Sequence, residues 1–306
     1  FGGPAFFLTS FQTHLSEPIM PIIKVLSVVL PVFSVIGIGY IFARFKKISL
    51  EAVIEILLYL TIPALVISSL SKRQLVASDL ALVSLAAFIV VIGTGAITWV
   101  YLNIIKRQDL RGFYLPTMFM NSGNMSFPLA LLAFGPDGLA VAVLYYIAIS
   151  LLVYTLGIYI AKGRGGFSEM FKLPLIYASA AGIILNLGGV TLPSPLLTTF
   201  EMLGAATIPI MQVSLGYRLY SAKLTYPWMS FIGSLIRIIG GAAIAYLVVH
   251  LLGIDGMNRK IIILSSGMPA AVINFVVSHR YNVNSDLVAS TVAASTLLSI
   301  ITTPIL

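Results

Sequence analysis

The chain has 306 residues, of which 59% are hydrophobic and only 9% are charged, and its mean hydropathy is +1.04. Soluble domains carry about 25% charged residues, so this composition excludes a soluble fold and predicts helices that cross a lipid bilayer. The formal net charge is +8, but the basic residues fall in short segments between apolar runs, so nucleic acid is not an expected partner. The absence of cysteine excludes disulfides and thiol chemistry.

Residues 1–19 differ from the rest of the chain. They contain a short apolar run but no basic segment of the kind that opens a signal peptide. Met20 begins the first complete apolar segment, which ends in a basic cluster. We therefore expect residues 1–19 to be an N-terminal tail that either precedes the true start at Met20 or is dispensable.

Ten apolar segments follow, each near the roughly 20 residues that a membrane-spanning helix needs. They cover residues 21–43, 49–71, 76–105, 112–134, 139–161, 173–189, 199–221, 226–252, 259–280 and 284–306. Twelve of the 18 Lys and Arg residues fall in the loops after the odd-numbered segments. Because basic loops stay in the cytoplasm, the sequence predicts an all-α, multi-pass protein of the cell (plasma) membrane with both termini outside.

Several motifs recur in the same order about 145 residues apart. They are Thr-Ile-Pro at 61–63 and 207–209, a proline at Pro31 and Pro174, and Ser-Gly at 122–123 and 266–267. A half of five helices crosses the membrane an odd number of times, so the second half would enter it in the opposite orientation. The sequence thus predicts two inverted five-helix repeats, 20–161 and 173–306, joined by a cytoplasmic linker at 162–172.

The fourth and ninth predicted helices are interrupted near their middles by polar residues, glycine and proline. Proline breaks the helical hydrogen-bond ladder, and backbone groups freed inside a membrane must line protein or a water-filled cavity. Two breaks at corresponding places in inverted halves would cross, and their exposed amide groups would suit an anion. The candidate substrate-binding residues are Asn121, Ser122, Gly123, Asn124, Pro128, Ser266, Gly267, Met268, Pro269 and Asn274. The alternative is that glycine and proline only kink packed helices.

Two polar residues inside other predicted helices are further candidates. Arg237 lies near the middle of the eighth helix, where a buried arginine costs at least about 2.5 kcal/mol. It is either a counter-charge or gate for a carboxylate substrate, or a structural partner of a helix C-terminus. Gln212, one turn after Pro209, either faces the site or makes a packing hydrogen bond.

The residue types that are absent from the predicted spans also limit the function. No carboxylate lies at the centre of a span, which argues against a cation/proton antiporter and leaves coupling to sodium or protons open. Intramembrane proteases need paired Asp, an HExxH motif or a Ser–His pair, and the three histidines lie at tails or helix ends, at His14, His250 and His279. We expect neither an enzyme nor a cofactor or metal site. A non-transporting receptor or lipid-binding membrane protein is the alternative from another class.

Two blocks of the sequence resemble the signature blocks of the auxin efflux carrier family. They are NSGNMSFPLALLAFG at 121–135 and GMPAAVINFVVSHRYNVNSDLVASTVAASTLLSIITTPIL at 267–306. The resemblance implies a ten-helix fold like that of bile acid/sodium symporters, in which a transport domain moves against a static scaffold that also forms a homodimer. By this resemblance the scaffold would be 20–75 and 173–224, and the transport domain 76–161 and 225–306. It places Asn121, Asn124, Pro128 and Pro269 at the substrate site, with Met268 and Asn274 less securely matched.

The sequence departs from the plant members of this family in two places. The third predicted helix lacks the charged residues that plant members place near the site, and residues 163–172 replace their long cytoplasmic loop. These differences weigh against auxin as the substrate. We expect a secondary transporter that moves a small organic anion, a carboxylate, by an elevator-type alternating-access mechanism. Its expected partners are that organic acid, membrane lipid and a second copy of the chain.

Overall fold

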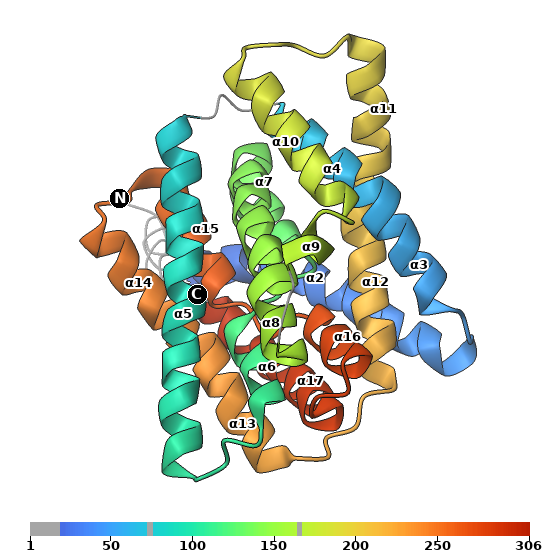
Figure 1. Cartoon of the computed structure of the whole chain (residues 1–306). Helices are drawn as coiled ribbons and strands as arrows, with labels where there is room; N and C mark the ends of the chain where they lie inside the picture. Colours follow the sequence, from blue (N-terminus) through green and yellow to red (C-terminus); the bar gives the residue numbers. More distant parts are fainter. Residues whose placement is uncertain (1–18, 72–75, 164–166) are drawn as a thin grey trace, which may run out of the picture.

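The computed structural model describes residues 19–71, 76–163 and 167–306, and within these ranges every regular element is a helix (Figure 1). One isolated antiparallel bridge joins Met120 to Ala270. Residues 1–18 of the predicted N-terminal tail lie outside the described residues. The described chain is therefore a helical polytopic protein, as the composition predicts.

The first helices are long and nearly continuous. They are α2 (Ile19–Phe45), then α3 (Leu50–Ile56), the π-helical η1 (Leu57–Thr61) and α4 (Ile62–Leu70) in one rod, and α5 (Ala77–Ile104). Pro63 is the second residue of α4, one residue after η1 ends at Thr61. In a regular helix the proline ring clashes with the carbonyl four residues earlier, and the wider π turn before Pro63 gives the ring more room.

The next segment is broken twice. A short helical stretch, η2 (Arg111–Phe113) with α6 (Tyr114–Met118), ends at Met118, and α7 (Ser126–Leu152), η3 (Val153–Gly157) and α8 (Ile158–Lys162) follow after a gap. Inside α7, Gly135 takes φ 68° and ψ −162°, a conformation outside the helical region that glycine adopts without a Cβ clash. The chain therefore turns at Gly135, just before Pro136, between the fourth and fifth predicted helices.

The second half of the chain consists of shorter helices. They are α9 (Phe167–Met170), α10 (Pro174–Leu187), α11 (Ser194–Ala205), α12 (Thr207–Tyr220), α13 (Pro227–Leu235), η4 (Ile236–Gly240), α14 (Gly241–Leu251), α15 (Gly256–Ser266), α16 (Ile273–Arg280), α17 (Ser285–Thr302) and η5 (Thr303–Ile305). The gap between α15 and α16 matches the predicted break in the ninth helix.

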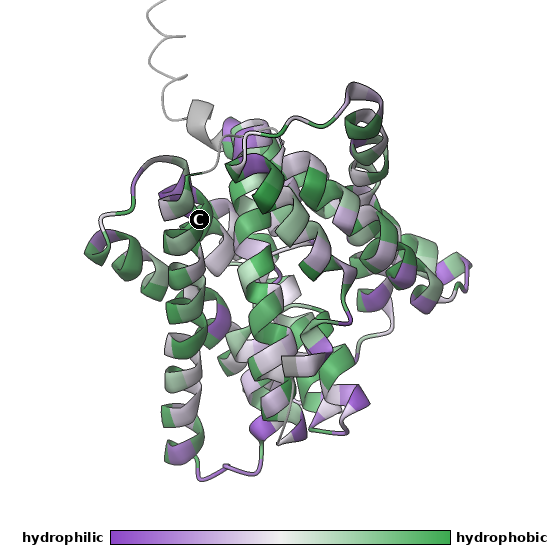
Figure 2. Ribbon diagram, turned by 45° about the horizontal axis from the view of Figure 1, so that its top comes forward, coloured by the Kyte–Doolittle hydropathy of each residue, from purple (hydrophilic) through white to green (hydrophobic). Residues whose placement is uncertain are grey.

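Seven helices among the described residues are long and apolar enough to cross a membrane. The predicted count of ten exceeds this number for a physical reason. With 14 residues, α10 is too short to be counted, and α15 and α16 are separated by a break. Ser126–Lys162 joins the end of the fourth predicted segment to the whole of the fifth in one run. Hydrophobic residues make up most of the length of the helices, while hydrophilic residues gather near the loops (Figure 2). Many large apolar side chains are exposed on the helices. Leu251, for example, is 84% exposed, which suits a lipid-facing position.

The helices pack in two sets. In the first, α2 lies along α12, and α4 packs against both α10 and α11. The contact between α2 and α12 is close, because a Cβ at Gly216 would collide with the backbone carbonyl of Ile36. In the second set, α5 and α15 pack on α7, α14 packs on α5 and α15, and α13 packs on α17. Helices α2 and α4 also touch α7, so the two sets share a boundary around the break before α7.

Candidate functional site

The two broken helices meet at their breaks. The extended residues after α6 pair with those after α15 through the Met120–Ala270 bridge. The amide of Asn121 donates to the carbonyl of Pro269 at 2.7 Å, and the amide of Ala271 donates to the carbonyl of Phe119 at 3.1 Å. Each break thus satisfies the backbone groups of the other, which a membrane interior requires.

The two breaks, residues 119–125 and 267–272, form what we call the crossing. Four half-helix ends surround it. Helices α6 and α15 end at Met118 and Ser266, and α7 and α16 begin at Ser126 and Ile273. Neither of the two beginning helices has a side chain that caps its first amide groups. The N-terminal ends carry a partial positive charge and the C-terminal ends a partial negative charge, so the crossing presents both signs within a buried centre.

Two asparagines lie at the crossing, and in each of them one of the two polar atoms of the side-chain amide makes a hydrogen bond. Asn274 is fully buried and donates from Nδ2 to the carbonyl of Phe119 at 2.8 Å, while its Oδ1 has no partner among the described residues. Asn121, 4% exposed, accepts at Oδ1 from the amide of Asn124 at 3.2 Å, and no atom in the described part of the chain pairs with its Nδ2. An orphaned buried polar group costs about 1–3 kcal/mol, so the crossing holds a free donor and a free acceptor that a ligand could satisfy.

Hydroxyl groups hold the crossing together from the sides. The Oγ atoms of Ser126 and Ser265 share a hydrogen bond of 2.6 Å, which joins the start of α7 to the end of α15. Tyr145 Oη and Ser266 Oγ share another at 2.7 Å. The amide of Ala270 donates to Ser295 Oγ on α17 at 3.1 Å. None of these bonds was predicted, although polar residues inside apolar spans were the available signal.

Arg237 lies on the side of the crossing where α6 and α15 end. It is fully buried, and Nη1 donates to the carbonyls of Thr117 and Met118 at 3.0 and 2.6 Å. Nη2 donates to the carbonyl of Ser266 at 2.9 Å. These contacts match the structural interpretation of Arg237, a partner for helix C-termini. Its role as a substrate counter-charge stays a prediction.

The remaining predicted residues divide between the crossing and the first packing set. A Cβ at Gly123 would lie 2.8 Å from Met211 Cε and 3.2 Å from Tyr146 Cε2, so this glycine lets α12 approach the break. Gln212 is buried, and Nε2 donates to the carbonyl of Val32 on α2 at 3.4 Å, which is a packing hydrogen bond. The other predicted residues are buried at the two breaks, and they are Ser122, Pro128, Gly267, Met268 and Pro269, whereas Asn124 is partly exposed.

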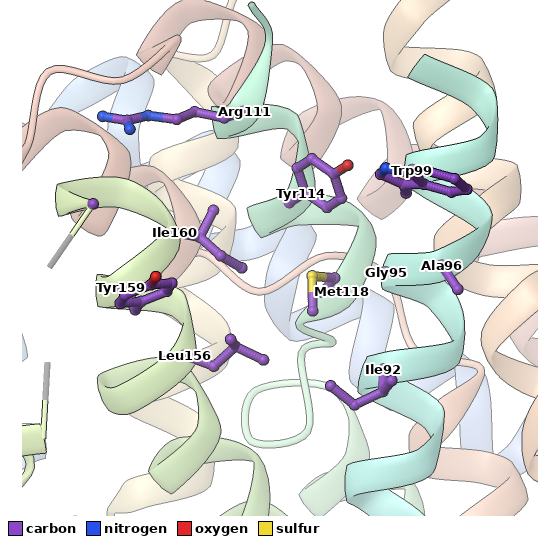
Figure 3. A pocket seen from close by; sticks show the side chains of 11 residues that line it. Ile92, Gly95, Ala96, Trp99, Arg111, Tyr114, Met118, Leu156, Tyr159 and Ile160 are labelled. Atoms are coloured by element: carbon purple, nitrogen blue, oxygen red, sulfur yellow. The ribbon is translucent and has the colours of Figure 1, made fainter. Parts of the chain in front are cut away.

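A separate cavity of about 710 Å³ opens between α5, α6 and the segment η3–α8 (Figure 3). Its lining is mainly apolar, with Trp99, Tyr114 and Arg111 toward one end and Ile92 and Leu156 toward the other. Arg111 Nη2 donates to the carbonyl of Ala161 at 3.3 Å. The cavity reaches the crossing only at Met118, so it is not a polar anion site.

Comparison with known proteins places the chain among transporters. Residues 167–306 match the model of a family described as membrane transport protein. An uncharacterized transporter of Methanocaldococcus jannaschii is 28% identical over 294 residues, 90% of this chain and 96% of the relative. One of Methanothermobacter thermautotrophicus is 27% identical, covering 90% and 95%. A putative malonate transporter of Rhizobium meliloti is 24% identical, covering 91% and 93%.

Proposed function

We propose that the chain is a member of the auxin efflux carrier-like family of membrane transport proteins and a secondary transporter of a small organic anion. The substrate is a carboxylate, bound where the two broken helices cross. The similarity to a putative malonate transporter supports this class of substrate.

The observation that carries the proposal is the unpartnered amide of Asn121. Its Nδ2 is a buried donor near the starts of α7 and α16, which no side chain caps among the described residues. A carboxylate oxygen accepts such hydrogen bonds, and bonds to charged acceptors are about twice as strong as neutral ones. The N-terminal ends of α7 and α16 add a positive partial charge that favours an anion over a neutral ligand.

The arrangement of elements supports ten membrane crossings in two inverted repeats. In this proposal the fourth crossing is η2–α6 with the first part of α7, the fifth is the rest of α7 to α8, the sixth is α10, and the ninth is α15 with α16. The repeated Thr-Ile-Pro motif supports the relationship, because η1 ends at Thr61 and α12 begins at Thr207. Both threonine hydroxyls are buried and lack a hydrogen-bond partner within the part of the chain that the structure describes, so the two motifs share an environment as well as a sequence.

The two packing sets support an elevator mechanism. The set around α2, α4, α10, α11 and α12 is the proposed scaffold, and the set around α5, α7 and α13–α17 is the proposed transport domain. The contact of Gly123 with Met211 lies on the boundary between them. Sliding of the second set along the first would carry the crossing from one membrane face to the other. The scaffold helices would also form a homodimer.

The loops support the proposed orientation. Three connecting segments meet at one end of the molecule, around a small polar cavity of about 280 Å³. They lie between α5 and η2, between α12 and α13, and between α16 and α17. The amide of Gly112 donates to Asn284 Oδ1 at 3.0 Å across this end. Lys106, Arg107 and Lys223 lie in the first two of these segments and Arg280 ends α16, so this end is the proposed cytoplasmic face of a plasma membrane protein, with both termini outside.

A lipid-binding receptor is the second candidate, and the apolar cavity lined by Trp99 and Arg111 is the observation that favours it. Its shape suits an acyl chain whose headgroup meets Arg111. A cation/proton antiporter has less support, because no carboxylate hydrogen-bonds at the crossing among the described residues.

Flux distinguishes these functions. Purified protein in proteoliposomes should accumulate radiolabelled malonate in a saturable manner, and an excess of unlabelled dicarboxylate should compete. Saturable binding with no flux would favour the receptor. Uptake of sodium or protons without any organic acid would favour the antiporter.

A further inference from the structure

The hydrogen bonds of Arg237 occupy the carbonyls that two ending helices leave free. The last residues of a helix have carbonyl groups with no intrahelical partner. At the end of α6 these include Thr117 and Met118, and at the end of α15 they include Ser266, and all three accept from the Arg237 guanidinium. One cation therefore closes the C-terminal ends of both half-helices.

The charge of Arg237 is matched by these helix ends and not by an acid. None of the side-chain ion pairs among the described residues involves Arg237. Each helix C-terminus carries a negative partial charge of at most about 0.5 of an elementary charge, so the two ends together offset part of the positive charge of Arg237. The surroundings therefore favour a cation at this place.

The backbone around Arg237 makes room for its guanidinium. Arg237 lies in η4, a π-helical turn, and such turns often occur at functional sites. Gly241 follows one turn later, and a Cβ there would collide with Arg237 Nη2 and with the carbonyl of Ser266. The glycine is thus required for the guanidinium to reach α15.

In transporters with broken helices, free carbonyls and half-helix C-terminal ends are where a coupling sodium ion or proton binds. We infer that Arg237 is a built-in cation at this place, so that binding and transport of the organic anion need no bound metal cation. This inference rests on the proposed function. It names Arg237 as a positioning residue, which fixes the crossing without touching the substrate.

The first test measures melting temperature and needs no substrate. In Arg237→Ala, the carbonyls of Thr117, Met118 and Ser266 lose their donor. The melting temperature of the full-length variant in detergent should therefore fall by about 5–10 °C. Millimolar sodium or guanidinium chloride should restore part of that loss, whereas choline chloride at equal concentration should not. In wild type and in the control Arg259→Ala, which removes a surface arginine, the melting temperature should not depend on which of the three salts is present. A destabilised Arg237→Ala that responds equally to all three salts would overturn the inference.

The second test measures malonate uptake into proteoliposomes with sodium or with choline. Wild type should transport at the same rate in both, and a wild type that requires sodium would overturn the inference. Arg237→Lys, which keeps a cation, should retain more uptake and a higher melting temperature than the neutral Arg237→Met, and equal losses in the two variants would count against it. If wild type transports no organic acid, the proposed function fails, while the melting experiment still decides whether Arg237 fills a cation site.

Discussion

The side chain of Asn274 donates a hydrogen bond to the backbone carbonyl of Phe119, 2.8 Å away and 155 residues earlier in the chain. Phe119 also accepts from the amide of Ala271. The break in the second half of the chain thus fixes the break in the first half through both backbone and side chain. A substrate held there would contact both halves at once.

Asn121→Asp should weaken substrate binding. The variant keeps an oxygen that can accept from the Asn124 amide, but it replaces the free Nδ2 donor with an acceptor. Malonate affinity should fall more than tenfold, which corresponds to more than about 1.4 kcal/mol. Isothermal titration of the purified protein measures this, with the exposed Asn282→Asp as the matched control. Equal affinity in Asn121→Asp and wild type would exclude Asn121 from the site.

Gly123→Ala should slow transport more than it weakens binding. Its Cβ would press against Met211 Cε at 2.8 Å, on the boundary between the two packing sets. The maximal uptake rate should fall several-fold, and the second substitution Met211→Ala should restore it. Gly37→Ala is the control, because nothing lies within 4 Å of a Cβ there. A Gly123→Ala variant with normal uptake would argue that this boundary does not move.

Gly216→Ala should destabilise the protein. Its Cβ would collide with the carbonyl of Ile36, so α2 and α12 must separate. Overpacking of this kind costs about 1–3 kcal/mol, and the melting temperature in detergent should fall. Gly37→Ala should leave it unchanged or raise it, because alanine favours a helix over glycine by up to about 1 kcal/mol. Similar melting of the two variants would contradict the close packing of α2 on α12.

Glu169, in the linker at 162–172, should make a small contribution to the stability of the folded protein that is lost at acid pH. The hydrogen bond from Lys172 Nζ to Glu169 Oε1 lowers the pKa of the Glu169 carboxyl, with a further contribution from Arg280. A lowered pKa stabilises the folded protein above the unfolded value of about 4.3, and this contribution disappears as the pH falls through the folded pKa.

The melting temperature of both proteins should fall between neutral pH and a pH below about 4.3. The fall should be larger in wild type than in Glu169→Gln, by on the order of 1 °C. Glu55→Gln, an exposed glutamate on α3, is the control. A larger acid loss in Glu169→Gln than in wild type would reverse the sign of this contribution.

The breaks themselves could be predicted from sequence, because Pro128, Pro269 and the neighbouring glycines and asparagines are incompatible with a continuous helix. A helix C-terminus was one predicted partner of Arg237, but the particular carbonyls could not be predicted, because they lie 29 to 120 residues away and no side-chain pattern reveals them. For Gln212 the sequence left a site role and a packing hydrogen bond open, and the structure shows a hydrogen bond to α2. The turn at Gly135 depends on a positive φ that the sequence permits but does not require.

The most direct test of the central claim is exchange of malonate across proteoliposome membranes that contain the full-length protein. Malonate loaded inside should accelerate the entry of radiolabelled malonate, and Asn121→Asp should reduce this exchange more than tenfold while Asn282→Asp leaves it intact. Exchange that is equally fast in Asn121→Asp, or binding of malonate by wild type without any exchange, would contradict a carboxylate transporter centred on the crossing.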